Sequence, residues 1–218
     1  MIRNLKTLGL AMVAALALSA VAASTASAEL EGGFTAENGT YPLHVHGVDG
    51  EGTNALTAGG APVECEEASY TGTLAEPSPT LKLDLSFENC VAGALTATVT
   101  VNGCTYDFHV GTGTGNGDWH GEAGLTCPSK PLEIHFYNAK PHSAATEVCT
   151  VTIGTQKNLK GLTLTDLGNN TVTAEGSVGG IKGHRSGACV GGATVPFEGA
   201  VLDADITVTG TNDNLDIG

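Results

Sequence analysis

The feature of this chain that most constrains its fold is the strict alternation of apolar and polar residues along many short runs. In 81–87, the apolar residues Leu81, Leu83, Leu85 and Phe87 alternate with three polar ones. Successive side chains of a β-strand point to opposite faces, so each run predicts a strand with one buried face and one wet face. The same alternation recurs at 95–101, 104–110, 132–137, 149–153, 162–164, 172–174, 195–201 and 204–208.

Turn signals separate these runs. Asn102-Gly103 lies between two of them, and Asn-Gly is the strongest short signal for a hairpin. Glycine-rich stretches at 111–117, 179–180 and 191–192 indicate further turns. The pattern predicts an all-β fold of about ten to twelve short antiparallel strands, either a β-sandwich or a barrel.

The first 28 residues have the pattern of a secretory signal peptide. Arg3 and Lys6 precede an uncharged apolar stretch over 8–21, and Ala26-Ser27-Ala28 is a small-residue cleavage site. The apolar stretch is shorter than the roughly 20 residues of a spanning helix. We therefore expect a signal-peptide helix over 1–28, a mature chain from Glu29, and no membrane insertion after cleavage.

Composition and spacing suggest how the remainder is organised. Residues 29–60 are rich in glycine and lack cysteine, which indicates an N-terminal arm or hairpin. Residues 61–218 carry every cysteine and most alternating runs, which indicates one disulfide-stabilised all-β domain. A candidate sub-domain break lies near 138–146, where Lys140-Pro141-His142 interrupts the strands.

Six cysteines in an exported chain predict three disulfides. No Cys-x-x-Cys occurs and the spacings fit no zinc site, so a structural role is favoured over metal or redox chemistry. Fifteen pairings are conceivable, and proximity within hairpins favours joining nearest neighbours. The expected pairs are Cys65 with Cys90, Cys104 with Cys127, and Cys149 with Cys189.

The charge of the chain excludes some classes of partner. There are 23 Asp and Glu against 9 Lys and Arg, a net charge of −14. Such a chain repels nucleic acids and anionic lipid surfaces. An acidic surface is otherwise typical of a protein that stays dispersed in solution.

Two kinds of residue could bind a metal ion. His44 and His46 are two apart on a predicted strand and point the same way, but no third ligand follows at motif spacing. The acidic segments 49–54, 203–205 and 211–216 offer oxygen atoms for calcium without matching the EF-hand pattern. We therefore assign no metal site and no cofactor, and whether these residues bind a metal stays open.

Motifs of catalysis are absent from the sequence. There is no Gly-x-Ser-x-Gly, no His-Glu-x-x-His and no phosphate-binding loop. Asp118, His120 and Glu122 alternate and could share one strand face, and Trp119 could stack on a sugar or be buried. Solvated faces with such residues are much commoner than catalytic sets, so we assign no catalytic residue and favour a non-enzymatic role.

Several stretches within residues 62–210 carry a resemblance to known proteins. The stretches are Phe87-Glu-Asn-Cys90, Asn102-Gly-Cys104-Thr-Tyr106, Cys127-Pro128, Cys149-Thr-Val-Thr-Ile-Gly-Thr-Gln156 and Asn158-Leu159. They resemble a group of uncharacterised secreted proteins of actinobacteria, although Gly154-Thr155 stands where the group is expected to have a proline. The resemblance implies a bacterial, exported, disulfide-bonded β protein, and it carries over no activity.

These expectations combine into one functional hypothesis. The chain is expected to be a secreted, non-enzymatic interaction or structural protein, extracellular or in the cell envelope, with an extracellular protein or a glycan as its partner. The alternative is a secreted binding module for a carbohydrate or a divalent cation.

Overall fold

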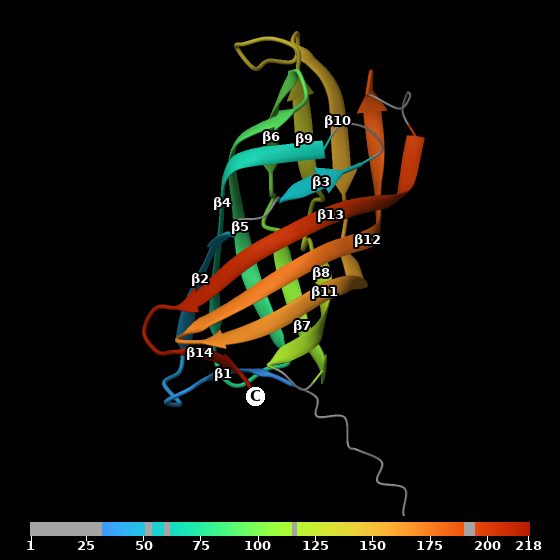
Figure 1. Ribbon diagram of the computed structural model, residues 1–218. Helices are drawn as coiled ribbons and strands as arrows, with labels where there is room; N and C mark the ends of the chain where they lie inside the picture. Colours follow the sequence, from blue (N-terminus) through green and yellow to red (C-terminus); the bar gives the residue numbers. More distant parts are fainter. Residues whose placement is uncertain (1–31, 51–53, 59–61, 115–116, 190–194) are drawn as a thin grey trace, which may run out of the picture.

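The computed structural model describes residues 32–50, 54–58, 62–114, 117–189 and 195–218, and in this part the regular elements are all β-strands (Figure 1). The expectation of an all-β, antiparallel fold is confirmed. The expected signal-peptide helix over 1–28 lies outside the described residues. None of the described residues forms a helix that could cross a membrane.

The described residues form fourteen strands, and several are longer than the short strands expected. Their bounds are β1 (Phe34–Ala36), β2 (Leu43–Asp49), β3 (Ala55–Thr57), β4 (Pro62–Leu74), β5 (Thr80–Ala92), β6 (Leu95–Thr100), β7 (Thr105–Gly113), β8 (Asp118–Thr126), β9 (Leu132–Tyr137), β10 (Glu147–Ile153), β11 (Gln156–Gly168), β12 (Thr171–Gly187), β13 (Val195–Gly210) and β14 (Leu215–Ile217).

Twelve of these strands form one antiparallel sheet that closes on itself. In one half of the molecule the hydrogen-bonded ring runs β5-β7-β8-β11-β12-β13-β2-β4 and returns to β5. In the other half it runs β5-β6-β9-β10-β12-β13-β3-β4 and again returns to β5. The long strands β4, β5, β12 and β13 belong to both rings, so they join the two halves end to end (Figure 1).

The other strands of this sheet come in consecutive pairs that run in the same direction. Both β6 and β7 are antiparallel to β5, β6 beside its end and β7 beside its beginning. The hairpin predicted at Asn102-Gly103 is therefore wrong, although the local turn is present, since the Cys104 N–H donates to the Val101 carbonyl over 2.8 Å. After this turn the chain continues in the same direction beside β5, which is long enough to pair with both β6 and β7.

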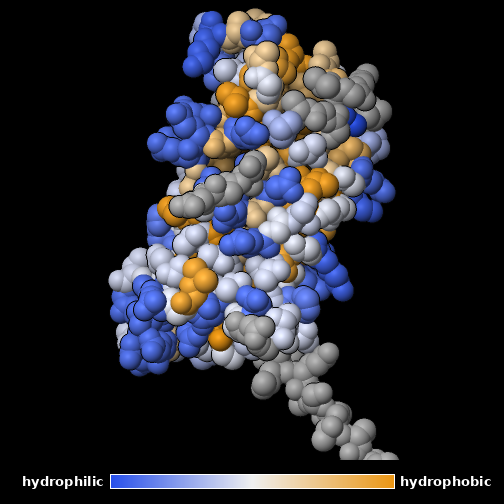
Figure 2. Space-filling model, viewed as in Figure 1, coloured by the Kyte–Doolittle hydropathy of each residue, from blue (hydrophilic) through white to orange (hydrophobic). Residues whose placement is uncertain are grey.

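The core lies inside the closed sheet, as the alternation predicts. Along β5, Leu81, Leu83 and Leu85 are buried while the residues between them are exposed. Burial of one such side chain is worth about 1.5–3 kcal/mol. The face of the molecule seen in Figure 2 is mostly hydrophilic or neutral, with small groups of hydrophobic residues between.

A small second sheet closes one end of the ring. β1 pairs with β14, and Phe34 and Leu215 from these strands are almost completely buried. Two side chains fasten this sheet to the main one. Asn170 accepts hydrogen bonds from the Gly210 and Leu215 N–H groups, and Asp166 accepts one from the Ile217 N–H. We call β1 and β14 the end sheet.

The three expected disulfides are present, and they join Cys65 to Cys90, Cys104 to Cys127, and Cys149 to Cys189. Cys65 and Cys90 are direct cross-strand partners on β4 and β5. Three disulfides in one chain are consistent with an oxidising compartment.

The two segments that the sequence analysis distinguished, 29–60 and 138–146, both adjoin strands of the large sheet. In the described part of 29–60, β2 pairs with β13 and β4, and so does β3. Residues 138–146 connect β9 to β10, which pair with each other.

Candidate functional site

The two histidines of β2 lie on its outer face, as the sequence predicts. His44 and His46 are both exposed, and the His44 Nδ1 lies 3.1 Å from the Thr73 hydroxyl. Across the residues that the structure describes, no three His, Cys, Asp or Glu side chains converge as a metal site. The pair therefore has no third ligand of these types in that part of the chain.

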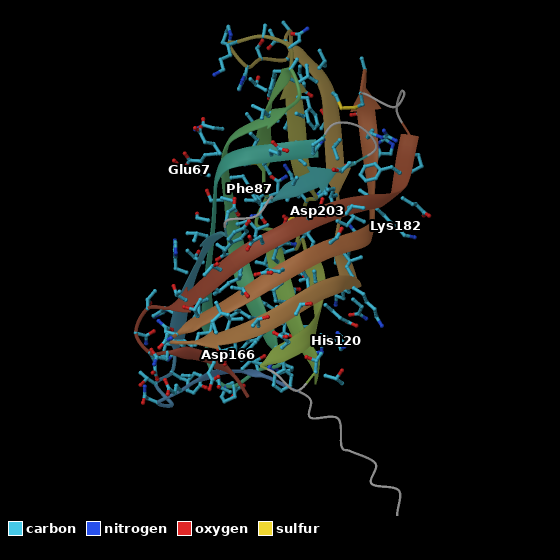
Figure 3. All side chains as sticks on the ribbon, viewed as in Figure 1. Glu67, Phe87, His120, Asp166, Lys182 and Asp203 are labelled. Carbon is cyan, nitrogen blue, oxygen red and sulfur yellow. A yellow bond between two sulfur atoms is a disulfide. The ribbon has the colours of Figure 1, made fainter. Side chains whose placement is uncertain are left out.

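The alternating set on β8 is engaged by neighbours on β11. Asp118 accepts a hydrogen bond of 2.7 Å from the Thr165 hydroxyl, and the Glu122 carboxylate lies 3.9 Å from the Lys160 ammonium. His120 is exposed (Figure 3). The structure thus brings the three together on the outer face of one strand without placing an acid and a base in hydrogen-bond contact there.

Trp119 occupies the opposite face of β8. Its side chain is partly buried against the core, close to the backbone of Gly113. This position gives Trp119 a packing role at the end of the ring near the end sheet.

The acidic segments fasten strands together. Asp213 accepts hydrogen bonds from the Asn38 side chain and the Thr40 N–H, which hold its pKa at about 2. The backbone of Asp205 exchanges two hydrogen bonds with the Asn54 side chain, at 2.7 and 2.8 Å. Residues 51–53 of the acidic segment 49–54 lie outside the described residues.

The strongest candidate for a functional site is a cavity of about 100 Å³ inside the closed sheet. Every strand of the twelve-stranded sheet contributes to its wall. Small side chains leave the space, among them Ala55, Ala68, Ala123 and Ala204. The cavity lies where the two halves of the molecule meet, because both the long strands and the shorter paired strands border it.

Some side chains of the cavity wall belong to the core and yet are only partly buried. They are Leu56, Cys65, Phe87, Val99, Tyr106, Leu159 and Leu202. Burial raises the pKa of Tyr106 to about 12, with a further contribution from the charge of Asp49. Tyr106 is thus enclosed by protein and still retains accessible surface, which we attribute to the cavity that it borders.

Aromatic rings gather on one side of the cavity. The Tyr70 and Tyr106 rings are stacked with centroids 6.2 Å apart, and Phe87 meets Tyr70 edge-on at 6.3 Å. Among the described residues, the Tyr106 hydroxyl has no hydrogen-bond partner, whereas the Tyr70 hydroxyl donates to Asp49 over 2.9 Å.

Asp49 is the one carboxylate among the described residues of the cavity wall. It ends the alternating run of β2 at an inward position. Burial raises its pKa above the ordinary value, the hydrogen bond from Tyr70 opposes this shift, and the charge of Asp205 adds to it. Asp49 is therefore an incompletely solvated anion at the edge of an apolar space.

The residues of the cavity wall were not predicted as a site from the sequence. One partial signal was available: Tyr70, Phe87 and Tyr106 are aromatic residues of a chain that is only 5% aromatic, although it is the order of the strands in the sheet that makes them neighbours. A second was Asp49, a charged residue where the alternation of Leu43 and Val45 expects an apolar one.

Comparison of the chain with protein-family models, with curated proteins and with solved structures gives no match.

Proposed function

We propose that this is an exported, non-enzymatic binding protein that holds one small, largely apolar molecule inside its closed sheet. The observation that carries the proposal is the cavity of about 100 Å³ with partly accessible apolar walls. A closed sheet of eight strands encloses just enough space for packed side chains or for one small ligand.

The energetic cost of an empty cavity favours an occupant. Unfilled apolar space costs about 24 cal/mol per Å³, so a cavity of about 100 Å³ costs about 2 kcal/mol. A dry apolar cavity of about 150 Å³ binds benzene or xenon. The cavity has about two thirds of that volume, so one small ring or a short hydrocarbon chain is the largest occupant that it suits.

The polar groups of the cavity wall support binding over catalysis. The Asn54 side chain is bonded to the backbone of Asp205, and the Gln156 side chain to the backbone of Lys182. Tyr70 is bonded to Asp49. Asn54 and Gln156 thereby hold strands in register, which leaves the Tyr106 hydroxyl and the second oxygen of Asp49, neither with a partner among the described residues, to meet a ligand.

Export is part of the proposal. It is supported by the signal-peptide pattern of residues 1–28, by the resemblance to secreted bacterial proteins, and by three disulfides that suit an oxidising compartment. Carbohydrate and divalent-cation ligands have less support, since the described residues offer no metal cluster and Trp119 packs against the core.

The test is a titration with benzene and toluene, followed by methyl NMR shifts and by the melting temperature. A ligand at 100 times its Kd stabilises by about 2.7 kcal/mol. For a chain of this size we expect the melting temperature to rise by about 5–10 °C. Methyl shifts should be confined to residues of the cavity wall, such as Val99 and Leu202.

A matched pair of variants separates the cavity from the surface. Val99→Phe fills the cavity and should abolish the stabilisation by toluene, whereas Val91→Phe adds the same ring at a position that is 42% exposed and should leave it unchanged. If Val99→Phe does not fold, Leu202→Phe serves the same purpose. Absence of any shift near the solubility limit of toluene, or equal binding by the filled variant, would overturn the proposal.

A further inference from the structure

The chemistry of the cavity wall narrows the class of ligand. Asp49 and Ala68 border the interior cavity and also border a groove on the outer surface. This groove has a volume of about 350 Å³ and is lined by Val48, Asp49, Glu66, Glu67, Ala68, Ser69, Ser86 and Glu88. We call it the acidic groove, and it lies directly beside the cavity.

The carboxylates gather where the alternation of inward and outward side chains shifts by one residue, at neighbouring positions of β4 and β5. On β4, Glu66 and Glu67 are both exposed, and the inward set changes from odd to even residues there. On β5, Glu88 and Asn89 are both exposed for the same reason, and Asn89 has a positive φ of 52°. Both strands therefore turn consecutive side chains outward; Figure 3 shows Glu67 projecting beyond the ribbon, with Phe87 inside its outline.

This arrangement is electrostatically unfavourable without a cation. Glu67 is the direct cross-strand partner of Glu88, and like charges in that position are destabilising. Across the described residues, none of Asp49, Glu66, Glu67 and Glu88 forms an ion pair. A positive charge at this place would relieve the repulsion.

The cavity side of Asp49 also suits a cation. The Tyr70 ring lies beside Asp49, its hydroxyl bonded to the carboxylate, and the Tyr106 ring is stacked on it. One oxygen of Asp49 accepts the Tyr70 hydroxyl, and among the described residues no group donates to the other, which is left for an ammonium group. Asp49 and the two tyrosines thus form one polar end of the cavity, and the other polar side chains of its wall, Asn54 and Gln156, are bonded to backbone groups.

We propose that the ligand of the interior cavity is a small organic amine, whose hydrocarbon part fills the cavity and whose ammonium group meets Asp49. The acidic groove raises the local concentration of such a cation. This inference rests on the proposed function, which requires only an apolar ligand.

The test compares ligands of the same shape and different charge by calorimetric titration. Benzylamine, benzyl alcohol and toluene share one ring, and only benzylamine is cationic at pH 7. At low salt we expect benzylamine to bind at least tenfold more tightly than benzyl alcohol. Raising the salt to 0.5 M should weaken benzylamine binding several-fold and leave toluene binding nearly unchanged.

Variants assign the preference to residues. Asp49→Asn keeps the acceptor for the Tyr70 hydroxyl and removes the charge, so the affinity for benzylamine should fall to that for benzyl alcohol. Glu76→Gln removes one exposed carboxylate at the β4–β5 connection, away from the groove, and serves as the control. If Asp49→Asn does not fold, the double variant Glu67→Gln, Glu88→Gln should lower the affinity for benzylamine about three- to tenfold at low salt.

The outcomes separate the two proposals. Toluene binding without a preference for benzylamine overturns the amine and leaves the apolar cavity standing as the function. A preference that survives in Asp49→Asn, or in the double glutamine variant if that is the one that folds, overturns the assignment of these carboxylates. Failure of all three ligands to bind overturns the proposed function itself.

Discussion

Two carboxyl groups meet where the end sheet lies against β11. Burial alone would raise the pKa of Asp166, but its hydrogen bonds with Asp216 and with the Gly168 and Ile217 N–H groups outweigh burial and lower it. The same hydrogen bond with Asp166, together with burial, raises the pKa of Asp216 from 3.8 to about 6. Below that pH, Asp216 carries the proton that holds the pair together.

This pair gives the molecule a dependence on pH. A carboxyl group whose pKa is raised on folding stabilises the fold fully below its unfolded pKa, and the stabilisation is lost as the pH rises through its folded pKa. From Asp216 we therefore expect the melting temperature to fall between pH 4 and pH 7. Asp216→Asn donates its hydrogen bond at every pH and should melt about 2–4 °C above the parent protein at pH 7.5.

The measurement is a series of melting curves from pH 4 to pH 8. Glu76→Gln removes the same charge from an exposed position and is the control for the overall charge of the protein. Parallel curves for the parent and Asp216→Asn would show that the pair does not titrate in this range.

At the scale of the element, the end sheet depends on a few completely buried side chains. Leu215 is 1% exposed on a strand of only three residues. Truncation of such a buried leucine costs about 2–5 kcal/mol. We therefore expect Leu215→Ala to lower the free energy of unfolding in urea by that amount.

Leu167→Ala is the matched control. Leu167 is 56% exposed at the end of β11, so its truncation should change the free energy of unfolding by less than about 0.5 kcal/mol. A change below about 0.5 kcal/mol for Leu215→Ala as well would mean that the burial of Leu215 in the end sheet does not contribute to stability.

Elements were predictable from the sequence wherever the alternation was unbroken. Leu81 to Phe87 gave β5 with the correct buried face, and Leu132, Ile134 and Phe136 gave β9. The slips at Glu66-Glu67 and Glu88-Asn89 were not predictable, because each depends on the other strand making the same change.

At the scale of the whole molecule, the long strands make the two halves one body. β4, β5, β12 and β13 hydrogen-bond to strands of both rings. One half therefore cannot unfold without breaking strands of the other. We expect a single calorimetric transition whose measured enthalpy equals the van't Hoff enthalpy, and two separate transitions would contradict this.

Removal of the disulfide between Cys149 and Cys189 is a second test of whether the long strands couple the two halves. This disulfide closes a loop of 40 residues near the pairing of β10 with β12. In the chain-entropy model, replacing both cysteines with alanine lowers the free energy of unfolding by about 4 kcal/mol. The transition should remain single at a lower temperature; melting of the half that contains β10 by itself would show that the long strands do not couple the halves.

The cavity could not be predicted from the sequence, because it is a property of the whole molecule. Tyr70, Phe87 and Tyr106 each look like ordinary core residues on their own strands. The cavity exists only because all twelve strands of the closed sheet border it, and no local pattern records that closure.

The pairing of early strands with late ones governs how a nascent molecule matures. β2 lies between β13 and β4, and β1 has only β14 as its strand partner within the described residues. A polypeptide that emerges with its N-terminus first keeps open hydrogen-bonding edges until β13 and β14 have appeared. Unprotected edges recruit other chains. Translation products that stop short of residue 195 are therefore expected to associate through those edges.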